Sequence, residues 1–333
     1  MTKIAINGLG RIGRAALKIL LKNDNVQVVA INDLVPTDNL AYLLRYDTVY
    51  GRYDLPVEHK ESALVIDGKE YPVYDKKDPA QLPWKDLKVD VVLECTGVFT
   101  NKEGLEKHIQ AGARQVILSA PAKSDDIPTV VHGVNHEQEL PQIISTASCT
   151  TNCIAPVVEI IKRRIGLRKA NMTTTHAYTS SQGIVDSPAK KVRRGRAAAA
   201  NFVPTSTGAA KATGKAMPEV EGIFDGAAIR GPVPAGSIAD INIVTEQKTS
   251  AEELKKIFEE EAEGRYHHVL GLSEDELVSS DILQDTRASI VDASMIQVVD
   301  GDLVKIMSWY DNEWGYASQM IRQATAMVAA EAA

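Results

Sequence analysis

Segment 147–153, with the sequence ASCTTNC, contains two of the three cysteines of this chain. Cys149 and Cys153 lie about one helical turn apart, with small hydroxyl residues between them. The apolar spacing of CIAPVVEIIKRRIG predicts a helix, and Ser148 is a good candidate for its N-cap. Cys149 would then lie in the first helical turn, where the helix dipole favours a thiolate. The segment therefore predicts a nucleophilic Cys149 with a lowered thiol pKa, and a packed Cys153.

A histidine that could activate this thiol follows in NMTTTHAYTS. His176 ends a run typical of a β-strand, so it would meet Cys149 at a sheet edge if the two strands are neighbours. Such a pair supplies a nucleophile and its general base. Taken singly, each residue fits an ordinary role better: a buried structural cysteine and a surface histidine at a strand end. A metal site is not predicted, because a second pair of ligands at zinc spacing does not follow.

The N-terminal segment contains the pattern G-x-G-x-x-G. Gly8, Gly10 and Gly13 follow an apolar strand at residues 3–7 and open an amphipathic helical run. Gly8 would permit a tight turn, Gly10 a close approach of the backbone to a pyrophosphate, and Gly13 close packing of the helix on the strand. A second apolar strand, VQVVAINDL, ends at Asp33, which would bind ribose hydroxyls and repel the 2′-phosphate of NADP. This order of elements predicts an NAD-binding domain.

Strands and helices continue to alternate through the first half of the chain. VDVVLECTG and RQVILSAPAK are predicted strands, separated by a helix in KEGLEKHIQAGA. Loops at the carboxyl ends of parallel strands face the ligand crevice, so Thr96, Gly97 and Ser119 are expected beside the cofactor. Cys95 is expected to be a small packed residue.

The second half carries the main basic cluster of an acidic protein. The cluster lies in KKVRRGRAAAANF and comprises Lys190, Lys191, Arg193, Arg194 and Arg196. A solvated loop that faces a partner explains most of these charges equally well. Thr207 and Gly208 open another helical run, a position suited to an anion, and Arg230 ends a predicted strand. The tail contains a hairpin signal at Asp300 and Gly301, followed by a closing helix from Trp314 to about Ala330.

Composition bounds the class of protein. The 333 residues are 44% hydrophobic, which favours two domains. The net charge of −7 argues against a nucleic-acid surface. No apolar run approaches the ~18 residues of a transmembrane helix. The first strand starts at Lys3, so we expect no cleaved signal peptide, and an odd number of cysteines suits a reducing cytoplasm.

Together these segments resemble the phosphorylating glyceraldehyde-3-phosphate dehydrogenase family along nearly the whole chain. The matching segments are INGLGRIGR, INDL, ASCTTNC, THAYT, RRGRAAA, PTSTGAAKA and SWYDNEWGY. The resemblance implies an α/β fold, with a Rossmann-type dinucleotide-binding domain and an α+β catalytic domain built on a mostly antiparallel sheet. The implied NAD-binding domain covers residues 1–148 and is completed by a C-terminal helix at 313–333, and the catalytic domain covers 149–312.

The resemblance also assigns roles to particular positions. Cys149 matches the nucleophile and His176 the residue that activates it. Cofactor contacts match Arg11, Ile12, Asp33, Lys77, Ser119 and Asn312, beside the predicted Gly8, Gly10, Gly13, Thr96 and Gly97. One phosphate site matches Thr179 and Arg230, and the other matches Ser148, Thr150, Thr207 and Gly208. Arg196 matches a substrate-domain arginine, with Arg194 close by.

The implied reaction is the NAD-dependent oxidative phosphorylation of D-glyceraldehyde 3-phosphate to 1,3-bisphosphoglycerate, through a thiohemiacetal and a thioester on Cys149. The implied partners are a phosphorylated aldehyde, inorganic phosphate and three further copies of the chain in a homotetramer. Ser181 stands where the family commonly has an acidic residue near the substrate phosphate. Ser187, before Pro188, replaces a leucine and would tolerate a 2′-phosphate better. Asp33 and Pro188 still favour NAD, and Ser187 leaves room for NADP as a secondary cofactor.

Two alternative functions stay open from the sequence. An erythrose-4-phosphate dehydrogenase would keep the chemistry and change the aldehyde, and turnover on the two aldehydes would separate them. A non-catalytic, NAD-dependent sensor or RNA-binding protein belongs to another class. The Cys149–His176 pair and the negative net charge of the chain count against that second alternative.

Overall fold

The computed structural model describes residues 1–136 and 140–332, which form two compact units. The first unit comprises Met1–Val130 with the described parts of Glu137–Ala147 and Met320–Ala333. The second comprises Val131–His136 and Ser148–Gln319. Among the described residues, no helix combines the length and the apolar character that a bilayer span requires.

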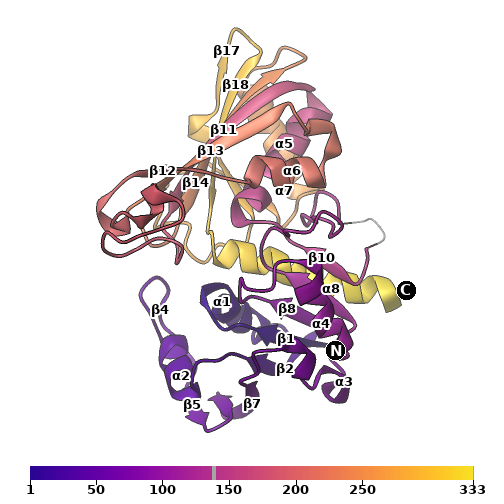
Figure 1. Cartoon of the computed structure of the whole chain (residues 1–333). Helices are drawn as coiled ribbons and strands as arrows, with labels where there is room; N and C mark the ends of the chain where they lie inside the picture. Colours follow the sequence, from indigo (N-terminus) through magenta and orange to yellow (C-terminus); the bar gives the residue numbers. More distant parts are fainter. Residues whose placement is uncertain (137–139, 333) are drawn as a thin grey trace. The chain divides into compact units, whose positions relative to one another are not determined.

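The first unit is built on an eight-stranded sheet with the order β10-β9-β8-β1-β2-β7-β6-β5 (Figure 1). The strands from β10 to β7 run parallel, and β6 and β5 add an antiparallel edge. Parallel strands buried on both faces are mostly apolar, as in β8, in which three apolar residues precede Glu94 and all four residues are buried. The strands are β1 Thr2–Asn7, β2 Val26–Asn32, β5 Val57–Lys60, β6 Ala63–Ile66, β7 Lys69–Tyr74, β8 Val91–Glu94, β9 Gln115–Leu118 and β10 Ile143–Ser145.

Helices connect these strands as crossovers. Helix α4 begins after Asn101, whose side chain accepts a hydrogen bond from the Gly104 N–H at 3.2 Å. It ends before Gly112, which adopts a left-handed φ of 103°. The helices are α1 Arg11–Leu20, α2 Thr37–Arg45, α3 Trp84–Leu87 and α4 Lys102–Gln110, with a 3₁₀ turn at Pro79–Gln81 and a small hairpin of β3 Tyr46–Asp47 and β4 Gly51–Arg52.

The second unit contains a sheet with the order β12-β13-β11-β14-β18-β16-β15. Antiparallel pairs predominate, and only β11–β13 and β15–β16 pair in parallel. The pattern of β14, in which every second residue is buried, is that of a sheet with one face on the core. The strands are β11 Leu167–Ala177, β12 Val203–Ser206, β13 Phe224–Gly231, β14 Ser237–Thr245, β15 Leu270–Ser273, β16 Ser289–Asp292, β17 Gln297–Val299 and β18 Leu303–Tyr310.

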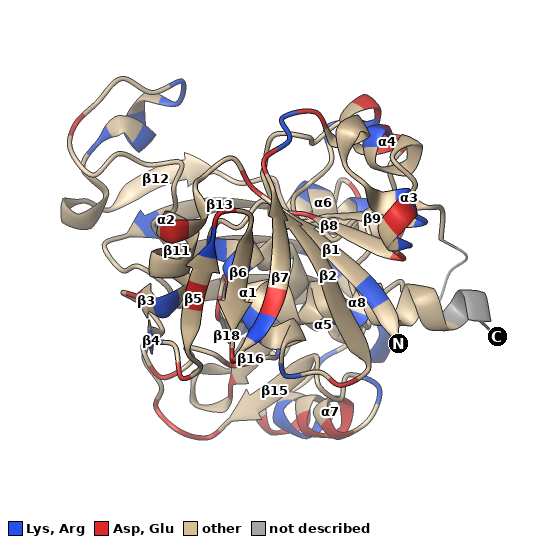
Figure 2. Cartoon of the chain, turned by 90° about the horizontal axis from the view of Figure 1, so that it is seen from below, with Lys and Arg blue, Asp and Glu red and all other residues tan. Residues whose placement is uncertain are grey.

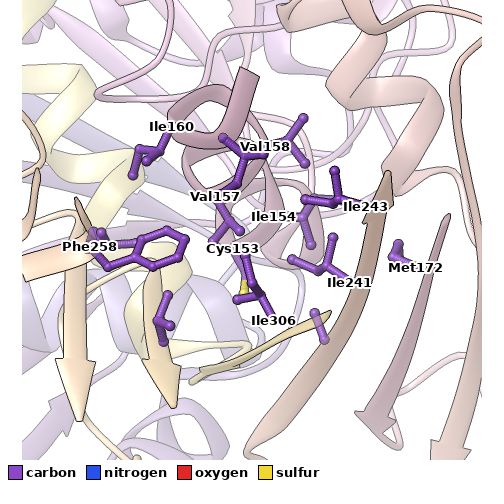
Figure 3. Close-up of a cluster of buried hydrophobic side chains, with 14 of the residues drawn as sticks. Cys153, Ile154, Val157, Val158, Ile160, Met172, Ile241, Ile243, Phe258 and Ile306 are labelled. Atoms are coloured by element: carbon purple, nitrogen blue, oxygen red, sulfur yellow. The ribbon is translucent and has the colours of Figure 1, made fainter. Parts of the chain in front are cut away.

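Helix α5, Cys149–Arg164, packs against this sheet and forms its core (Figure 3). Cys153 is fully buried among Ile154, Phe258 and Ile306, so its predicted packing role agrees with its place. Burial raises the pKa of the Cys153 thiol to about 12. The other helices are α6 Ala209–Ala216 and α7 Ala251–Glu263, with 3₁₀ turns at Val192–Gly195, Ala198–Ala200, Pro218–Val220 and Ala293–Met295.

The last strands and the closing helix form where the sequence pattern predicts them. β17 and β18 pair as a hairpin through Asp300 and Gly301, both of which have positive φ. Helix α8, Trp314–Ala332, buries the predicted apolar face: Ala317, Met320, Ile321, Ala324 and Met327. The boundary between the two units falls inside this helix, between Gln319 and Met320. The predicted fold class, a Rossmann-type unit beside a unit with a mostly antiparallel sheet, is confirmed.

Candidate active site

The start of helix α5 holds the cysteine that the sequence singled out. Ser148 is the N-cap, and its Oγ accepts a hydrogen bond from the Thr151 N–H at 3.1 Å. Cys149 is the first residue of the helix, and its Sγ lies 3.3 Å from Nε2 of His176. His176 is buried near the end of β11, so the two side chains come from separate elements of the second unit. This is the contact that a nucleophile and its base require.

The second nitrogen of His176 determines which tautomer faces the thiol. Nδ1 lies 2.7 Å from the carbonyl oxygen of Ala177, so we assign the hydrogen to Nδ1. Arg230 Nη1 lies 2.6 Å from Nδ1 and 3.0 Å from the same carbonyl. Because a guanidinium nitrogen can only donate, the contact with Arg230 calls for a lone pair on Nδ1, whereas the contact with the carbonyl calls for a hydrogen there. We choose the tautomer with the hydrogen on Nδ1, in which Arg230 donates to the carbonyl of Ala177 and Nε2 keeps the lone pair toward Cys149 that a general base needs.

Burial controls the ionisation of this pair. Burial, together with the positive charge of Arg230, lowers the pKa of His176 to about 3. Burial also raises the pKa of the Cys149 thiol, against the opposing effects of Arg230 and of hydrogen bonds from Thr150. The predicted lowering of the thiol pKa is therefore wrong, because desolvation outweighs the helix N-terminus. Both shifts favour the uncharged forms of the two side chains.

The basic loop contributes a different arginine from the one expected. Arg196 is exposed and pairs with Asp186 at 2.9 Å. Arg194 is half-buried, and its Nε donates to Thr205 Oγ1 at 3.1 Å. The charge of Arg194 lowers the pKa values of both His176 and Arg230, so it faces the site. Of the two arginines, Arg194 lies nearer to His176 and Arg230, because Arg196 pairs with Asp186.

Hydroxyl groups lie beside Arg194 and at the start of α6. Thr179 Oγ1 lies 2.9 Å from Ser181 Oγ, and Arg194 Nη1 donates to Ser181 Oγ at 3.4 Å. At the helix, Thr207 Oγ1 accepts from the Ala209 N–H at 3.2 Å, and the N-cap residue Gly208 has open space on its Cβ side. A half-buried hydroxyl at a helix N-terminus suits an anion.

Sequence reasoning missed one buried side chain at the site. Tyr310, at the end of β18, contacts Thr150 through its hydroxyl and places its ring edge on the ring of His176, with centroids 5.8 Å apart. Its only sequence signal was a tyrosine at the end of an apolar strand, which by itself predicts packing.

The first unit contains a cavity of about 330 Å³ at the carboxyl ends of its central strands. Five of its lining residues are predicted cofactor contacts: Gly8, Gly10, Asp33, Lys77 and Thr96. Gly8 has a φ of 93°, and a Cβ there would lie 2.7 Å from the Thr96 nitrogen. A Cβ on Gly13 would lie 2.0 Å from the carbonyl oxygen of Gly8. The chain can therefore follow this path only with glycine at both positions, which fits a dinucleotide cradle.

Asp33 anchors the turn as well as lining the cavity. Its carboxylate accepts from the N–H groups of Leu9 at 2.6 Å and of Val35 at 2.9 Å. Each carboxylate oxygen keeps a further lone pair that a ribose hydroxyl can use. The donor and acceptor set thus fits the ribose of NAD.

The remaining predicted cofactor residues lie in different surroundings. Arg11 pairs with Asp47 at 2.6 Å. Ile12 follows it in the first turn of α1, Gly97 is exposed with a φ of 72°, and Ser119 follows β9 directly. Asn312 belongs to the second unit, where its side-chain oxygen accepts from Gly236 N–H and Ser237 Oγ–H.

A buried polar network, also missed from the sequence, supports the wall of this cavity. Glu94 accepts from the Thr96 N–H at 2.8 Å and from Asn7 Nδ2 at 2.5 Å, and it lies 3.1 Å from His108 Nε2. Asn7 in turn accepts from Asn32 at 2.7 Å. These long-range bonds fix the loops after β1, β2 and β8 relative to one another. Among the described residues, no group of three or more His, Cys, Asp and Glu side chains is placed to hold a metal ion.

A Rossmann-type unit with a glycine-lined cavity and a unit with a cysteine–histidine pair define a nicotinamide-dependent dehydrogenase with a thiol nucleophile. The family model described as the NAD binding domain of glyceraldehyde 3-phosphate dehydrogenase matches residues 2–102, and the C-terminal domain model matches residues 148–312. The chain belongs to the glyceraldehyde 3-phosphate dehydrogenase family, and its first unit carries the family's NAD-binding domain.

Curated relatives cover nearly the entire chain. A glyceraldehyde-3-phosphate dehydrogenase of Thermotoga maritima is 49% identical over 325 residues, which is 96% of this chain and 97% of the relative. Glyceraldehyde-3-phosphate dehydrogenase 1 of Bacillus cereus is 47% identical over 330 residues, 98% of each. The enzyme of Geobacillus stearothermophilus is 45% identical over 322 residues, 96% of each.

Proposed function

We propose that this protein catalyses the NAD-dependent oxidative phosphorylation of D-glyceraldehyde 3-phosphate to 1,3-bisphosphoglycerate, a step of glycolysis and gluconeogenesis. The observation that carries the proposal is the distance of 3.3 Å between Cys149 Sγ and His176 Nε2, in a chain of this family. The neutral imidazole can accept the thiol proton as the sulfur attacks the aldehyde carbon. That proton then passes to the aldehyde oxygen, which gives a thiohemiacetal.

Oxidation and release follow from the same two side chains. His176 accepts the hydroxyl proton of the thiohemiacetal as it becomes a thioester on Cys149. NAD, when bound, takes up the hydrogen and two electrons that this oxidation releases. Inorganic phosphate attacks the thioester carbon, the acyl phosphate leaves, and the Cys149 sulfur regains a proton from His176.

Two groups of polar residues are proposed to hold the two phosphates. Thr179, Arg230 and Arg194 would hold one, and Arg194 replaces Arg196 in this role because of its contacts with Thr205 and Ser181. Ser148, Thr150, Thr207 and Gly208 would hold the other. Helix N-termini and arginine donors both favour phosphate oxygens.

The cofactor residues are proposed as a set. NAD would contact Gly8, Gly10, Arg11, Ile12, Gly13, Asp33, Lys77, Thr96, Gly97, Ser119 and Asn312. The lining of the 330 Å³ cavity and the lone pairs of Asp33 support the first-unit members of this set. NADP is expected as a secondary cofactor, since Ser187 is polar and exposed.

We also propose the functional domains and the assembly. The NAD-binding domain would span residues 1–148 with the C-terminal helix at 313–333, and the catalytic domain residues 149–312. The loop between β11 and β12 carries the basic cluster visible beside β12 (Figure 2) and exposes Ile184 by 86% and Phe202 by 71%. Exposed apolar side chains on one segment mark an interface, which supports a homotetramer. Three free cysteines suit a cytoplasmic protein.

NADH absorbance tests the proposed activity directly. The protein is assayed with glyceraldehyde 3-phosphate with and without inorganic phosphate, and erythrose 4-phosphate replaces the aldehyde in parallel. We expect phosphate-dependent NADH formation that is faster with glyceraldehyde 3-phosphate. A higher kcat/KM with erythrose 4-phosphate would favour an erythrose-4-phosphate dehydrogenase. The absence of NADH formation with both aldehydes would overturn the proposal.

A matched pair of cysteine variants tests the nucleophile. Cys149→Ser should abolish NADH formation, because an alkoxide is much harder to generate than a thiolate. Cys153→Ser should keep most of the activity, since its hydroxyl falls near Ser289 Oγ and the Ser308 carbonyl, each 3.8 Å from the present sulfur. Near-normal turnover of Cys149→Ser would rule out the covalent route.

A further inference from the structure

The buried carboxylate of Glu94 holds two residues that line the cavity of the first unit. Glu94 is the last residue of β8, and both of its oxygens accept hydrogen bonds. Oε1 accepts from the backbone N–H of Thr96 at 2.8 Å and from the Thr96 hydroxyl. Oε2 accepts from Asn7 Nδ2 at 2.5 Å and lies 3.1 Å from His108 Nε2. Since Asn7 and Thr96 line the cavity, this carboxylate ties two parts of its wall together.

The second nitrogen of His108 determines what its Nε2 offers to Glu94. Trp84 Nε1 lies 3.0 Å from His108 Nδ1. An indole N–H can only donate, so Nδ1 carries a lone pair and the ring hydrogen lies on Nε2. Nε2 therefore donates to the Glu94 carboxylate. Trp84, His108 and Glu94 thus form a line of hydrogen bonds that runs from α3 through α4 to the end of β8.

Hydrogen bonds extend from this line to a third part of the cavity wall. Asn7 Oδ1 accepts from Asn32 Nδ2 at 2.7 Å. The side chain of Asn32 in turn holds the backbone of Lys76, because its oxygen accepts from the Lys76 N–H at 2.9 Å and its nitrogen donates to the Lys76 carbonyl at 3.0 Å. Asn32 and Lys76 also line the cavity. The position of Glu94 therefore affects the chain at the ends of β1, β2, β7 and β8.

His108 supplies a hydrogen bond that water cannot replace. Glu94, His108 and Trp84 are each 0% exposed. A buried carboxylate that loses a donor must turn toward the donors that remain, because an unpaired buried charge is costly. Among the described residues, these remaining donors are Asn7 and Thr96. A change at His108 is therefore expected to displace residues that line the cavity, although His108 itself does not line it.

We propose that His108 is a positioning residue for NAD, which fixes the Glu94 carboxylate through its Nε2–H and so holds Asn7 and Thr96 in the arrangement that the dinucleotide requires. The inference rests on the proposed NAD contacts of this cavity. Groups that contact a ligand keep a precise arrangement only where supporting hydrogen bonds lock them in place. His108 acts on the cofactor only through the residues that Glu94 holds.

Two variants of His108 separate its hydrogen bond to Glu94 from its packing. Both His108→Gln and His108→Asn remove the ring, which stacks on Trp84 and lies edge-on to Phe99 with centroids 6.4 Å apart. The amide of glutamine reaches as far along the side chain as Nε2, so it can still donate to Glu94. The amide of asparagine reaches only as far as Nδ1, so it can accept from Trp84 but leaves Glu94 without this donor.

Isothermal titration calorimetry with NAD on the full chain measures the effect. We expect His108→Gln to bind NAD within about twofold of wild type and His108→Asn to bind it roughly tenfold more weakly, since a hydrogen bond to a charged group is worth about that factor. In NADH formation, His108→Asn should raise the KM for NAD with a smaller change in kcat, because Cys149 and His176 belong to the other unit. Equal NAD affinities of the two variants overturn the proposal, as does weaker binding by His108→Gln.

Leu105→Ala controls for a loss of stability in the same helix. Leu105 is fully buried in α4 and belongs to an apolar cluster with Val116, Leu118 and Ile127. Its truncation leaves a cavity and should lower Tm, while NAD affinity stays within about twofold of wild type. If Leu105→Ala weakens NAD binding as much as His108→Asn does, general loosening explains both results and the proposal is wrong.

A variant in the cavity keeps this inference distinct from the assignment of the NAD site. Asp33 lines the cavity, so Asp33→Ala should itself weaken NAD binding. If it does so while the two His108 variants bind alike, only the positioning role fails. If Asp33→Ala binds NAD as well as wild type does, the cavity assignment fails and this inference fails with it. Calorimetry needs no aldehyde or phosphate, so neither result depends on the dehydrogenase assay.

Discussion

Replacing Ser148 by alanine removes the N-cap of the helix that carries Cys149. The lost hydrogen bond to the Thr151 N–H costs about 1 kcal/mol in typical helices. Ser148 Oγ also lies 2.8 Å from the hydroxyl of Thr151, which is fully buried. Leaving that hydroxyl without this partner adds roughly 1–3 kcal/mol. Ser148→Ala should therefore destabilise the second unit by roughly 2–4 kcal/mol.

Ser250 offers a matched control in the same unit. It caps α7, and its Oγ accepts from the Glu253 N–H at 3.2 Å at an exposed helix start. Ser250→Ala should cost only the cap, about 1 kcal/mol. One kcal/mol shifts Tm by roughly 2–4 °C in a unit of this size, so we expect roughly 4–16 °C for Ser148→Ala and roughly 2–4 °C for Ser250→Ala.

Thermal melting followed by circular dichroism, together with NADH formation, checks both expectations. Ser148→Ala should also lower kcat/KM, since the first turn of α5 positions Cys149, whereas Ser250→Ala should leave it unchanged. Ser148→Thr keeps an oxygen at the cap and should recover most of the loss. Equal Tm shifts in the two alanine variants would refute the argument that the buried Thr151 hydroxyl depends on Ser148.

Three further predictions concern the cofactor, pH and assembly. Asp33→Gly should narrow the preference in kcat/KM for NAD over NADP. It should also raise the KM for NAD, because Asp33 accepts hydrogen bonds from the N–H groups of Leu9 and Val35 and so holds the turn. A preference of the unmodified protein for NADP would contradict this prediction. His176 has a pKa of about 3 when folded, below its ordinary 6.5, so the unfolded chain binds the proton first and stability falls as the pH drops from 6.5 toward 3. Between pH 7 and 5, wild type should lose on the order of 2 kcal/mol more than His176→Asn, measured by denaturant unfolding, and parallel losses would argue against a buried neutral imidazole. Light scattering should give a tetramer, and Phe202→Asp should weaken it; a mass near the 36.1 kDa of one chain for the wild type would contradict the assembly.

Features that depend on neighbouring residues could be predicted from the sequence. The glycine pattern requires Gly8 and Gly13, because the turn and the helix packing leave no room for a Cβ. Ser148 caps α5 as predicted, since a cap bonds to the N–H three residues further on. The hairpin at Asp300 and the buried face of α8 follow from turn chemistry and from helical period in the same way.

The ionisation and orientation of the site depend on residues far apart in the chain. The sequence predicted a lowered pKa for Cys149 from its helix position, but burial among elements that come later in the chain raises it. Two arginines two positions apart could not be ranked until the loop placed Arg194 against Thr205 and Arg196 against Asp186. The line from Trp84 through His108 to Glu94 joins three elements. Local sequence periodicity contains no record of such contacts, because desolvation and hydrogen-bond direction are set by whichever distant groups the tertiary fold brings within a few ångströms.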